Sequence, residues 1–270
     1  MSTLIRPLVL SLLCCILSAC ATSPTGRQQL MLVSEESSIA SSKTAYLSTV
    51  KQLDDAGKLE DDWVVNKRVD VITGLLVTEA IKMRPETANW EWSVVVIDDP
   101  KMVNAWCMAG GRMAIYTGLI TQLDPTDDEL AQVMAHEISH ALAKHTAEKM
   151  SMQIATSVGV AAVGIASDNT GVALSGAALT AMLAVNLPNS RAAETEADRM
   201  GIELAAKAGF DPAAAATLWK KMSKVSKSGT PQFLSTHPAP SNRQQELARL
   251  EPEMRKFYDP HAEHAIYKLG

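Results

Sequence analysis

The sequence predicts an α+β protein that is mostly helical and carries a small β-sheet. Two long segments, about 34–53 and 61–82, have the apolar spacing and the charge placement of helices. Between residues 90 and 120, the stretches "WEWSVVVIDD" and "RMAIYTGLI" are rich in β-branched or alternating apolar residues, which is typical of strands. With 270 residues, of which 47% are apolar, the chain is long enough for one large domain or for a domain with a small appendage.

The charge composition argues against a nucleic-acid-binding protein. The chain has 25 Lys and Arg against 30 Asp and Glu, a net charge of −5, and no long run of one sign stands out. Binding to nucleic-acid phosphates requires a clustered basic face. We therefore expect no nucleic-acid partner.

The N-terminus, residues 1–19, has the layout of a secretory signal peptide. Arg6 precedes an apolar run that is too short to span a bilayer and ends in "LSAC". This ending resembles a bacterial lipobox, and the small and polar residues around Cys20 favour lipidation of Cys20 over an ordinary signal peptide. We expect residues 20–33 to be a lipidated cysteine and a flexible tether. Because no Asp follows Cys20, we expect a lipid anchor in the outer membrane, facing the periplasm.

Each of the first elements has a recognisable beginning or end. The first helix has Glu35 and Glu36 in its first turn, where carboxylates interact favourably with the helix dipole. The second helix has an apolar stripe along one face, and the first strand closes on turn residues at Asp99 and Pro100. The second strand follows a Gly-Gly pair and runs into a short helix at Leu119.

A capping box predicts the start of the next helix. Thr126 is followed three residues later by Glu129, so that the two residues cap each other's backbone N–H groups. We expect this helix to run to about Met150. A Pro- and Ser-rich loop comes later in the chain, and a final helix opens at Ser241 and is followed by a tail, residues 259–270.

Residues 152–187 contain two apolar halves rich in Ala and Gly. Each half is shorter than the roughly 20 residues that a membrane-spanning helix requires. Two interpretations are open. The halves are helices buried in the core or packed over the site, or they form a hairpin that touches the membrane or an apolar substrate.

The stretch "MAHEISHALAKH" contains the pattern H-E-x-x-H. His136 and His140 are four residues apart on the expected helix, so both imidazoles face one ion. Zinc accepts nitrogen and carboxylate ligands, and Glu137 is adjacent, where it can take a proton from a zinc-bound water that attacks a carbonyl. His145 would lie on the opposite side of the helix and is not expected to bind the metal. The pattern predicts one catalytic zinc ion per chain.

A third protein ligand is available in "SRAAETEADRMG". Glu194 and Asp198 are four residues apart on an expected helix and can face the first metal-binding helix together. Taken alone, this acidic stretch would be read as a solvated face. Beside H-E-x-x-H, we expect Glu194 to bind the zinc and Asp198 to accept a hydrogen bond from the free N–H of a ligating histidine.

These motifs, in this order, resemble those of the M48 family of zinc metallopeptidases, and among them the exported bacterial forms of the chaperone-protease type that serve outer-membrane assembly. "VNAWCMAGGRMAIYTGLI" resembles the family's N-A-F…P-G-G…I-x-x-x-x-G-L-L segment, "HEISH" its zinc motif, "ETEAD" its E-x-x-x-D, and "STHPAPSNR" its late H-P…R segment. The resemblance covers roughly residues 90–245. Trp106 and Ser139 replace the usual Phe and Gly, and a Pro before Gly110 is missing, but no ligand is lost.

The resemblance implies a gluzincin-like metalloprotease domain over residues 34–258, with a small sheet whose edge strand lies above the zinc site. A peptide that pairs with a strand edge is held by its backbone whatever its sequence. The substrate specificity would therefore be broad and favour unfolded segments. It also implies that Asn104, Gly111 and Arg243 line the substrate cleft. His237 would come from a loop and either stabilise the oxyanion during catalysis or occupy the open zinc position in a resting state.

The leading hypothesis is a zinc endopeptidase of the cell envelope that cleaves misfolded or stalled proteins. Its expected partners are unfolded envelope proteins, the membrane through the lipid anchor, and the outer-membrane assembly machinery. The alternative is a chaperone-like binding protein of the same fold with little or no proteolysis. A purely structural lipoprotein would leave the ligand set unexplained. Glu137 favours the enzyme, because a structural metal site has no use for a carboxylate beside its ligands.

Overall fold

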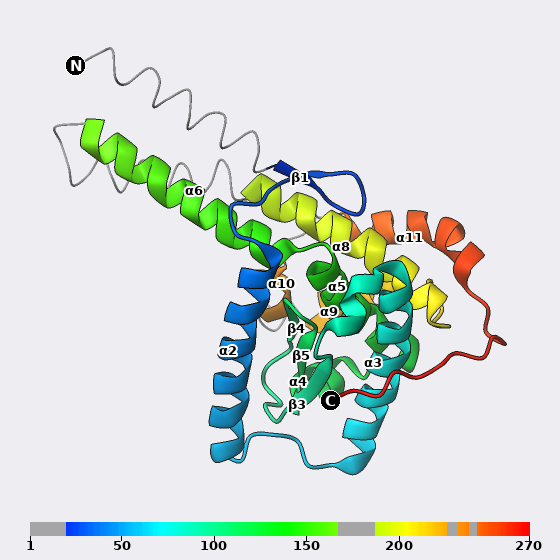
Figure 1. Cartoon of the computed structure of the whole chain (residues 1–270). Coiled ribbons are helices and arrows are strands. Elements are labelled where there is room, and N and C mark those ends of the chain that lie inside the picture. Colours follow the sequence, from blue (N-terminus) through cyan, green and yellow to red (C-terminus); the bar gives the residue numbers. More distant parts are fainter. Residues whose placement is uncertain (1–19, 167–186, 226–231, 238–241) are drawn as a thin grey trace. The chain divides into compact units, whose positions relative to one another are not determined.

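The computed structural model describes residues 20–166, 187–225, 232–237 and 242–270 (Figure 1). The chain forms two compact units, one of residues 1–38 with 144–187 and the other of residues 39–143 with 188–270. These boundaries differ from the expected division into a tether and one domain over 34–258. The predicted signal peptide lies outside the described residues.

In the smaller unit, a β-hairpin replaces the expected flexible tether. Strand β1 (Cys20–Thr22) pairs antiparallel with β2 (Gln28–Leu30). Arg27 donates to both carboxylate oxygens of Glu148 at 2.6 Å, and Gln29 donates to the same carboxylate at 2.8 Å. The hairpin is thus fixed to helix α6 (His145–Ala166) by a buried charge and its partners. The composition of residues 20–33 resembled that of a linker, because the partner that fixes the hairpin, Glu148, lies far away in the sequence. Lipidation of Cys20 stays a prediction.

Two long helices open the larger part of the fold, as the sequence predicted. Helix α2 covers Glu35–Asp55 and α3 covers Trp63–Met83. Helix α3 begins where Asp62 caps it, because the carboxylate of Asp62 accepts a hydrogen bond from the backbone N–H of Val64 at 2.7 Å. The apolar stripe of α3 lies in the core of the larger unit.

The sheet has three strands: β3 (Ser93–Ile97), β4 (Ala105–Met108) and β5 (Arg112–Tyr116). Strand β5 lies in the middle, parallel to β3 and antiparallel to β4. The "GGRMAIY" strand is therefore not an edge, since both of its sides are hydrogen-bonded within the sheet. The edge strand that packs against the metal-binding helix is β4, which the sequence analysis did not resolve as a separate strand.

The H-E-x-x-H helix is α5 (Asp127–Leu142), preceded by the short helix α4 (Thr117–Leu123). The predicted capping box is present. The backbone N–H of Glu129 donates to the hydroxyl of Thr126 at 3.2 Å, and the backbone N–H of Thr126 donates to the carboxylate of Glu129 at 3.0 Å. All residues from Glu129 to Leu142 except His140 are buried.

The expected continuation of this helix to Met150 is wrong. The chain turns after Leu142, where Lys144 adopts a left-handed conformation with φ 60°, and α6 starts at His145. His145 therefore opens a new helix instead of ending the first, so its position relative to His136 does not follow from the spacing on one helix. No Gly or Pro marks the break, so the local sequence gives no signal for it.

The remaining described elements complete the larger unit, apart from the first residue of α8. They are η1 (Pro85–Asn89), α8 (Leu187–Lys207), α9 (Ala214–Val225), α10 (Gln232–Thr236), α11 (Arg243–Met254) and η4 (Arg255–Phe257). The final helix begins at Arg243, two residues later than expected. The C-terminal segment crosses α3 (Figure 1), where the N–H of Tyr267 donates to the carbonyl of Gly74 at 3.0 Å.

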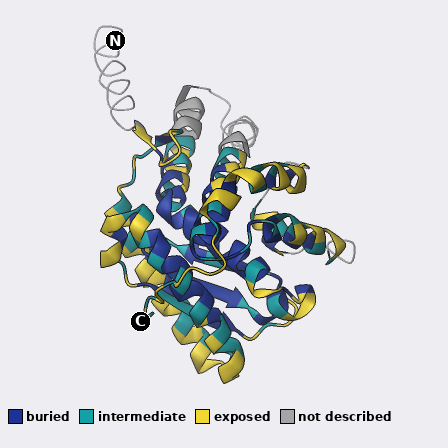
Figure 2. Ribbon diagram, turned by 90° about the vertical axis from the view of Figure 1, so that its right-hand side faces the viewer, coloured by how far each residue is buried: buried dark blue, intermediate teal, exposed yellow. Residues whose placement is uncertain are grey.

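Buried residues run through the sheet and the helices packed on it (Figure 2). Helix α5 contributes many of them, including the polar residues His136 and Glu137. Buried polar groups need partners, so their presence on a core helix already indicates a site.

Within the described residues, no helix combines the length and the apolar character that crossing a membrane requires. Helix α6 carries the first apolar half as far as Ala166. Most of the second half, residues 167–186, lies outside the described residues, so the choice between a core helix and a membrane hairpin stays open.

Candidate metal centre

Four side chains from three parts of the chain converge in the larger unit. His136 and His140 come from α5, Glu194 comes from α8, and His237 directly follows α10. One ligand atom from each lies within 4.8 Å of all the others. Three of these residues, His136, His140 and Glu194, were predicted from the sequence as ligands, and the structure brings them together.

The two histidines of α5 present the same nitrogen to one point. Nε2 of His136 lies 3.0 Å from Nε2 of His140, as the four-residue spacing on a helix requires. The carboxylate of Glu194 faces both rings, with its oxygens 3.3 Å from Nε2 of His136 and 3.5 Å from Nε2 of His140. This is a set of imidazole nitrogens and one carboxylate, which suits zinc in a catalytic site.

Asp198 lies behind the first ligand. It is one turn further along α8 than Glu194, and its carboxylate is 3.0 Å from Nδ1 of His136. With Nδ1 occupied in this way, His136 keeps Nε2 free for a metal. The predicted role of Asp198 therefore has the geometry that it requires.

Arg243 contacts the metal-binding residues, and its place in the substrate cleft stays a prediction. Its side chain is buried, and its Nη2 donates to the carboxylate of Asp198 while lying 3.1 Å from Nδ1 of His136. Its Nη1 is 3.5 Å from the carboxylate of Glu194. One guanidinium therefore pairs with two carboxylates and offsets half of their combined charge.

The pKa values of His136 and Glu194 are shifted by their contacts with each other and with their neighbours. Burial and the charge of Arg243 oppose protonation of His136, but hydrogen bonds to Asp198 and Glu194 outweigh them and raise the pKa of His136 to about 9. For Glu194, burial acts against ionisation, yet hydrogen bonds from His136, His140 and His237 hold its pKa far below the ordinary value. The centre is thus a cluster of opposite charges. A metal ion that binds there would displace the protons that the imidazoles carry in its absence.

Glu137 lies beside the ligands without being one of the four. Its side chain is 3% exposed, and burial raises the pKa of its carboxyl above the usual range. Oε1 of Glu137 lies 3.3 Å from Nε2 of His237. A carboxylate with a raised pKa next to metal ligands is suited to proton transfer.

His237 reaches the centre as the resemblance implied. Its Nδ1 is 3.2 Å from the carboxylate of Glu194 and 3.3 Å from Nε2 of His136. The ring stacks on Phe233, with centroids 4.5 Å apart at 25°, and the backbone N–H of His237 donates to the carbonyl of Phe233. Phe233 in turn donates its backbone N–H to the carbonyl of Val103, which lies just before β4.

Asn104 and Gly111 are not part of the ligand group. Asn104 is near β4, and its backbone carbonyl accepts a hydrogen bond from the N–H of Tyr116. Gly111 lies in the turn between β4 and β5 with φ 81°, and a Cβ there would be 2.4 Å from the ring of Trp92. Gly111 is therefore required for packing against Trp92, and nothing in its contacts links it to a substrate.

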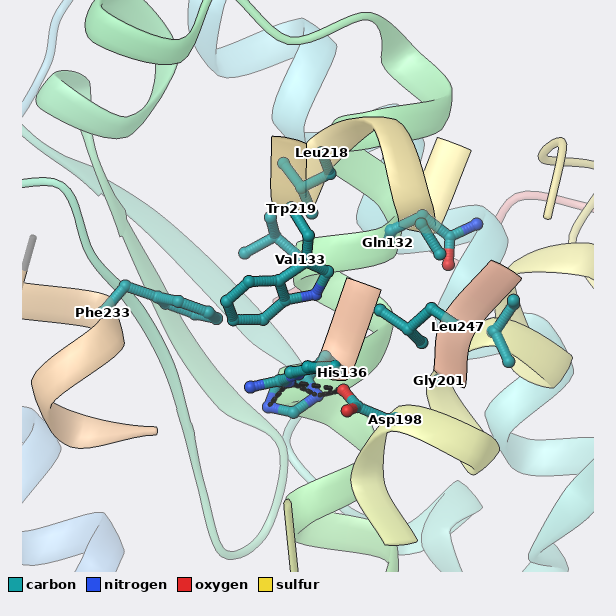
Figure 3. Close-up of a pocket in the computed structure, with 12 residues that line it drawn as sticks. Gln132, Val133, His136, Asp198, Gly201, Leu218, Trp219, Phe233 and Leu247 are labelled. Atoms are coloured by element: carbon teal, nitrogen blue, oxygen red, sulfur yellow. Dashed lines mark hydrogen bonds and ion pairs between the residues drawn. The ribbon is translucent and has the colours of Figure 1, made fainter. Parts of the chain in front are cut away.

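A cavity of about 20 Å³ lies beside His136 (Figure 3). Arg243 and Asp198 form part of its wall, and Trp219 and Phe233 form another part. Neither aromatic residue was predicted from the sequence. No motif marks them, because their contacts with the centre come only from the packing of α9 and α10.

Known proteins share this chain's motifs over most of its length. The profile of Peptidase family M48 matches residues 66–251. The human "Metalloendopeptidase OMA1, mitochondrial" is 30% identical over 245 residues, which is 86% of this chain and 46% of that protein. The "Mitochondrial metalloendopeptidase OMA1" of Arabidopsis thaliana is 31% identical over 196 residues, 71% of this chain and 37% of that protein. The "Beta-barrel assembly-enhancing protease" of Yersinia pestis is 31% identical over 204 residues, 72% of this chain and 40% of that protein.

The chain spans less than half the length of each of these three relatives. Their names also correct the expected location. A lipid anchor in the outer membrane was inferred from the few residues around Cys20, but relatives from plants, mammals and yeasts are named as mitochondrial enzymes. The prediction of an outer-membrane location is therefore wrong: it rested only on the few residues around Cys20, and these relatives are named as mitochondrial.

Proposed function

The chain belongs to peptidase family M48, as its motifs predicted, and we propose that it is a zinc-dependent endopeptidase that cleaves unfolded segments of misfolded or stalled proteins. One observation carries the proposal. Three ligands, His136, His140 and Glu194, converge on one point, and a buried carboxylate that is not a ligand lies next to them. A metal held only for structure needs no such carboxylate.

The residues that would hold zinc each have a defined partner. His136, His140 and Glu194 supply the metal-binding atoms, and Asp198 keeps the proton of His136 on Nδ1. When bound in such a site, zinc acts as a Lewis acid that polarises a carbonyl oxygen and makes water more acidic. Arg243 pairs with Asp198 and Glu194. Its charge favours the ionised form of Glu137 and so opposes the effect of the Glu194 charge, which raises the pKa of Glu137.

Glu137 would move the protons of the reaction. As water adds to the carbonyl carbon of the peptide bond, Glu137 accepts one of its protons. When the C–N bond breaks, Glu137 returns that proton to the departing amine nitrogen. Burial raises the pKa of Glu137, and a carboxyl with a raised pKa accepts and releases a proton more evenly near neutral pH.

The edge strand beside the centre supports an extended substrate. β4 packs against α5, and its far edge is not paired within the three-stranded sheet. A polypeptide that adds to this edge would be held by backbone hydrogen bonds, which are the same for every sequence. Folded proteins rarely offer a free strand, so the substrates we propose are unfolded segments.

Cleavage of a permanently unfolded protein, such as reduced and alkylated casein, tests this function. We expect fragments with the zinc-loaded protein, none after a chelator has removed the metal, and recovery when zinc is added back. The folded form of a compact protein of similar size should stay intact in the same assay. Binding of the unfolded protein without any fragments would instead support the chaperone-like alternative.

A further inference from the structure

Trp219 is in contact with the metal centre although it supplies no ligand. It lies on α9 and is only partly buried, and the guanidinium carbon of Arg243 is 3.9 Å from the centroid of its ring. Figure 3 shows the indole above His136, at the wall of the cavity. At this distance, the cation lies on the face of the aromatic ring, where the interaction is favourable.

The hydrogen bonds of Arg243 do not by themselves fix its orientation. One nitrogen, Nη2, donates to Asp198 and also lies 3.1 Å from Nδ1 of His136. Among the described residues, Nε and Nη1 have no hydrogen-bond partner, and Nη1 has only the ion pair with Glu194 at 3.5 Å. A planar group held by Nη2 and by one longer ion pair can still tilt about the line through these two contacts. The ring of Trp219 supplies the flat surface that prevents this tilt.

Trp219 is itself held by an aromatic neighbour. Its ring centroid is 6.1 Å from that of Phe233, which is 1% exposed and belongs to the core. The neighbouring cavity of about 20 Å³ means that a smaller residue at position 219 would leave the guanidinium room to move. The indole is therefore placed to act on the ligands through Arg243.

We propose that Trp219 is a positioning residue of the metal centre: its ring holds the guanidinium of Arg243 flat, and Arg243 in turn holds Asp198 and His136 in the orientation that binds zinc. This inference rests on the proposed zinc site, but its test reads zinc binding and not proteolysis. Failure of the proposed peptidase activity would therefore leave the test intact.

The test compares Trp219→Leu with Trp219→Phe in the full chain. Zinc affinity is measured by competition with a chromophoric chelator. We expect Trp219→Leu to weaken zinc binding by about tenfold, which is usual when a residue that orients a metal ligand without binding the metal is replaced. Trp219→Phe retains an aromatic face and should bind zinc about as well as wild type. If Trp219→Leu does not fold, as judged by its thermal melt, Trp219→Met replaces it, because Met fills irregular space well.

A matched control and a double-mutant cycle separate positioning from simple packing. Trp90→Leu removes another tryptophan that faces a guanidinium, that of Arg84 at 5.4 Å, and should leave zinc affinity unchanged. Once Arg243→Lys has removed the planar group, Trp219→Leu should weaken zinc binding no further. Wild-type zinc affinity in Trp219→Leu, no rescue by Phe, or additive effects in the cycle would each overturn the proposal.

Discussion

His237 bridges the predicted base and a predicted ligand: its Nε2 lies 3.3 Å from Glu137 and its Nδ1 lies 3.2 Å from Glu194. One imidazole therefore occupies the space in which a substrate carbonyl and the attacking water would have to meet. We propose that His237 in this position blocks the centre and has to be displaced before a peptide can bind. Residues on loops are suited to such movement.

Removal of this histidine tests its role. We expect His237→Ala to cleave an unfolded protein faster than wild type, because the space beside Glu137 becomes free, while zinc remains bound. The measurement is the initial rate of cleavage at equal zinc content. If His237 chiefly stabilises the oxyanion, the rate should instead fall by about 10²-fold or more. An unchanged rate with unchanged zinc affinity would show that His237 does neither.

Loss of a ligand should remove the metal. His136→Ala and Glu194→Ala each take one of the three predicted protein ligands away, so we expect purified protein with far less than one zinc ion per chain. Elemental analysis of the purified variants measures this directly. Thr195→Ala, an exposed neighbour of Glu194, is the matched control and should retain zinc. Stoichiometric zinc in both ligand variants would mean that the ligands are assigned wrongly.

Zinc binding should depend on pH. In the metal-free protein, hydrogen bonds to Asp198 and Glu194 raise the pKa of His136 to about 9, so this ring carries a proton at neutral pH and must lose it to bind zinc. Apparent affinity should therefore fall by about tenfold for each unit that the pH drops below 9. Calorimetry in two buffers with different heats of ionisation counts the protons released. Release of no proton near pH 7 would contradict the raised pKa.

The raised pKa of His136 also determines how the stability of the metal-free protein changes with pH. A raised pKa means that the folded chain binds the proton more tightly than the unfolded chain. The stabilisation from protonated His136 is therefore complete below the unfolded value near 6.5 and is lost as the pH rises through about 9. Asp198→Asn removes one cause of the shift and should flatten this dependence in chemical denaturation curves.

The start of the metal-binding helix should be sensitive to its cap. Thr126→Ala removes one half of the capping box, and we expect the free energy of unfolding to fall by about 1 kcal/mol. The cleavage rate per folded molecule should not change, because the cap lies at the other end of α5 from the ligands. Thr44→Ala, at an exposed position inside α2, is the control. Equal stability of the two variants in urea denaturation would show that the cap is dispensable.

The parts of the centre that could be predicted from the sequence are those set by local spacing. Residues four apart on a helix share a face, so H-E-x-x-H and the pair Glu194 and Asp198 could each be placed before the fold was known. The capping box at Thr126 likewise depends on neighbours in sequence. The family resemblance supplied His237 and Arg243, but not which atoms they contact.

What could not be predicted depends on contacts between distant residues. The stacking of Arg243 on Trp219 follows from how α9 and α11 pack, and no spacing in either helix encodes it. At the break after Leu142, Lys144 is left-handed, which is uncommon for a residue other than Gly, and no Gly or Pro nearby signals it. The hairpin that begins at Cys20 resembled a linker because its buried partner, Glu148, is far away in sequence.

The most direct test of the account is Glu137→Gln, which removes the proposed base and leaves His136, His140 and Glu194 in place. The variant should bind one zinc ion per chain and melt like wild type. Its cleavage of an unfolded protein should fall by at least about 10²-fold, the usual contribution of a general base. Cleavage at the wild-type rate by this zinc-loaded variant would contradict the assignment of Glu137 and with it the proposed mechanism.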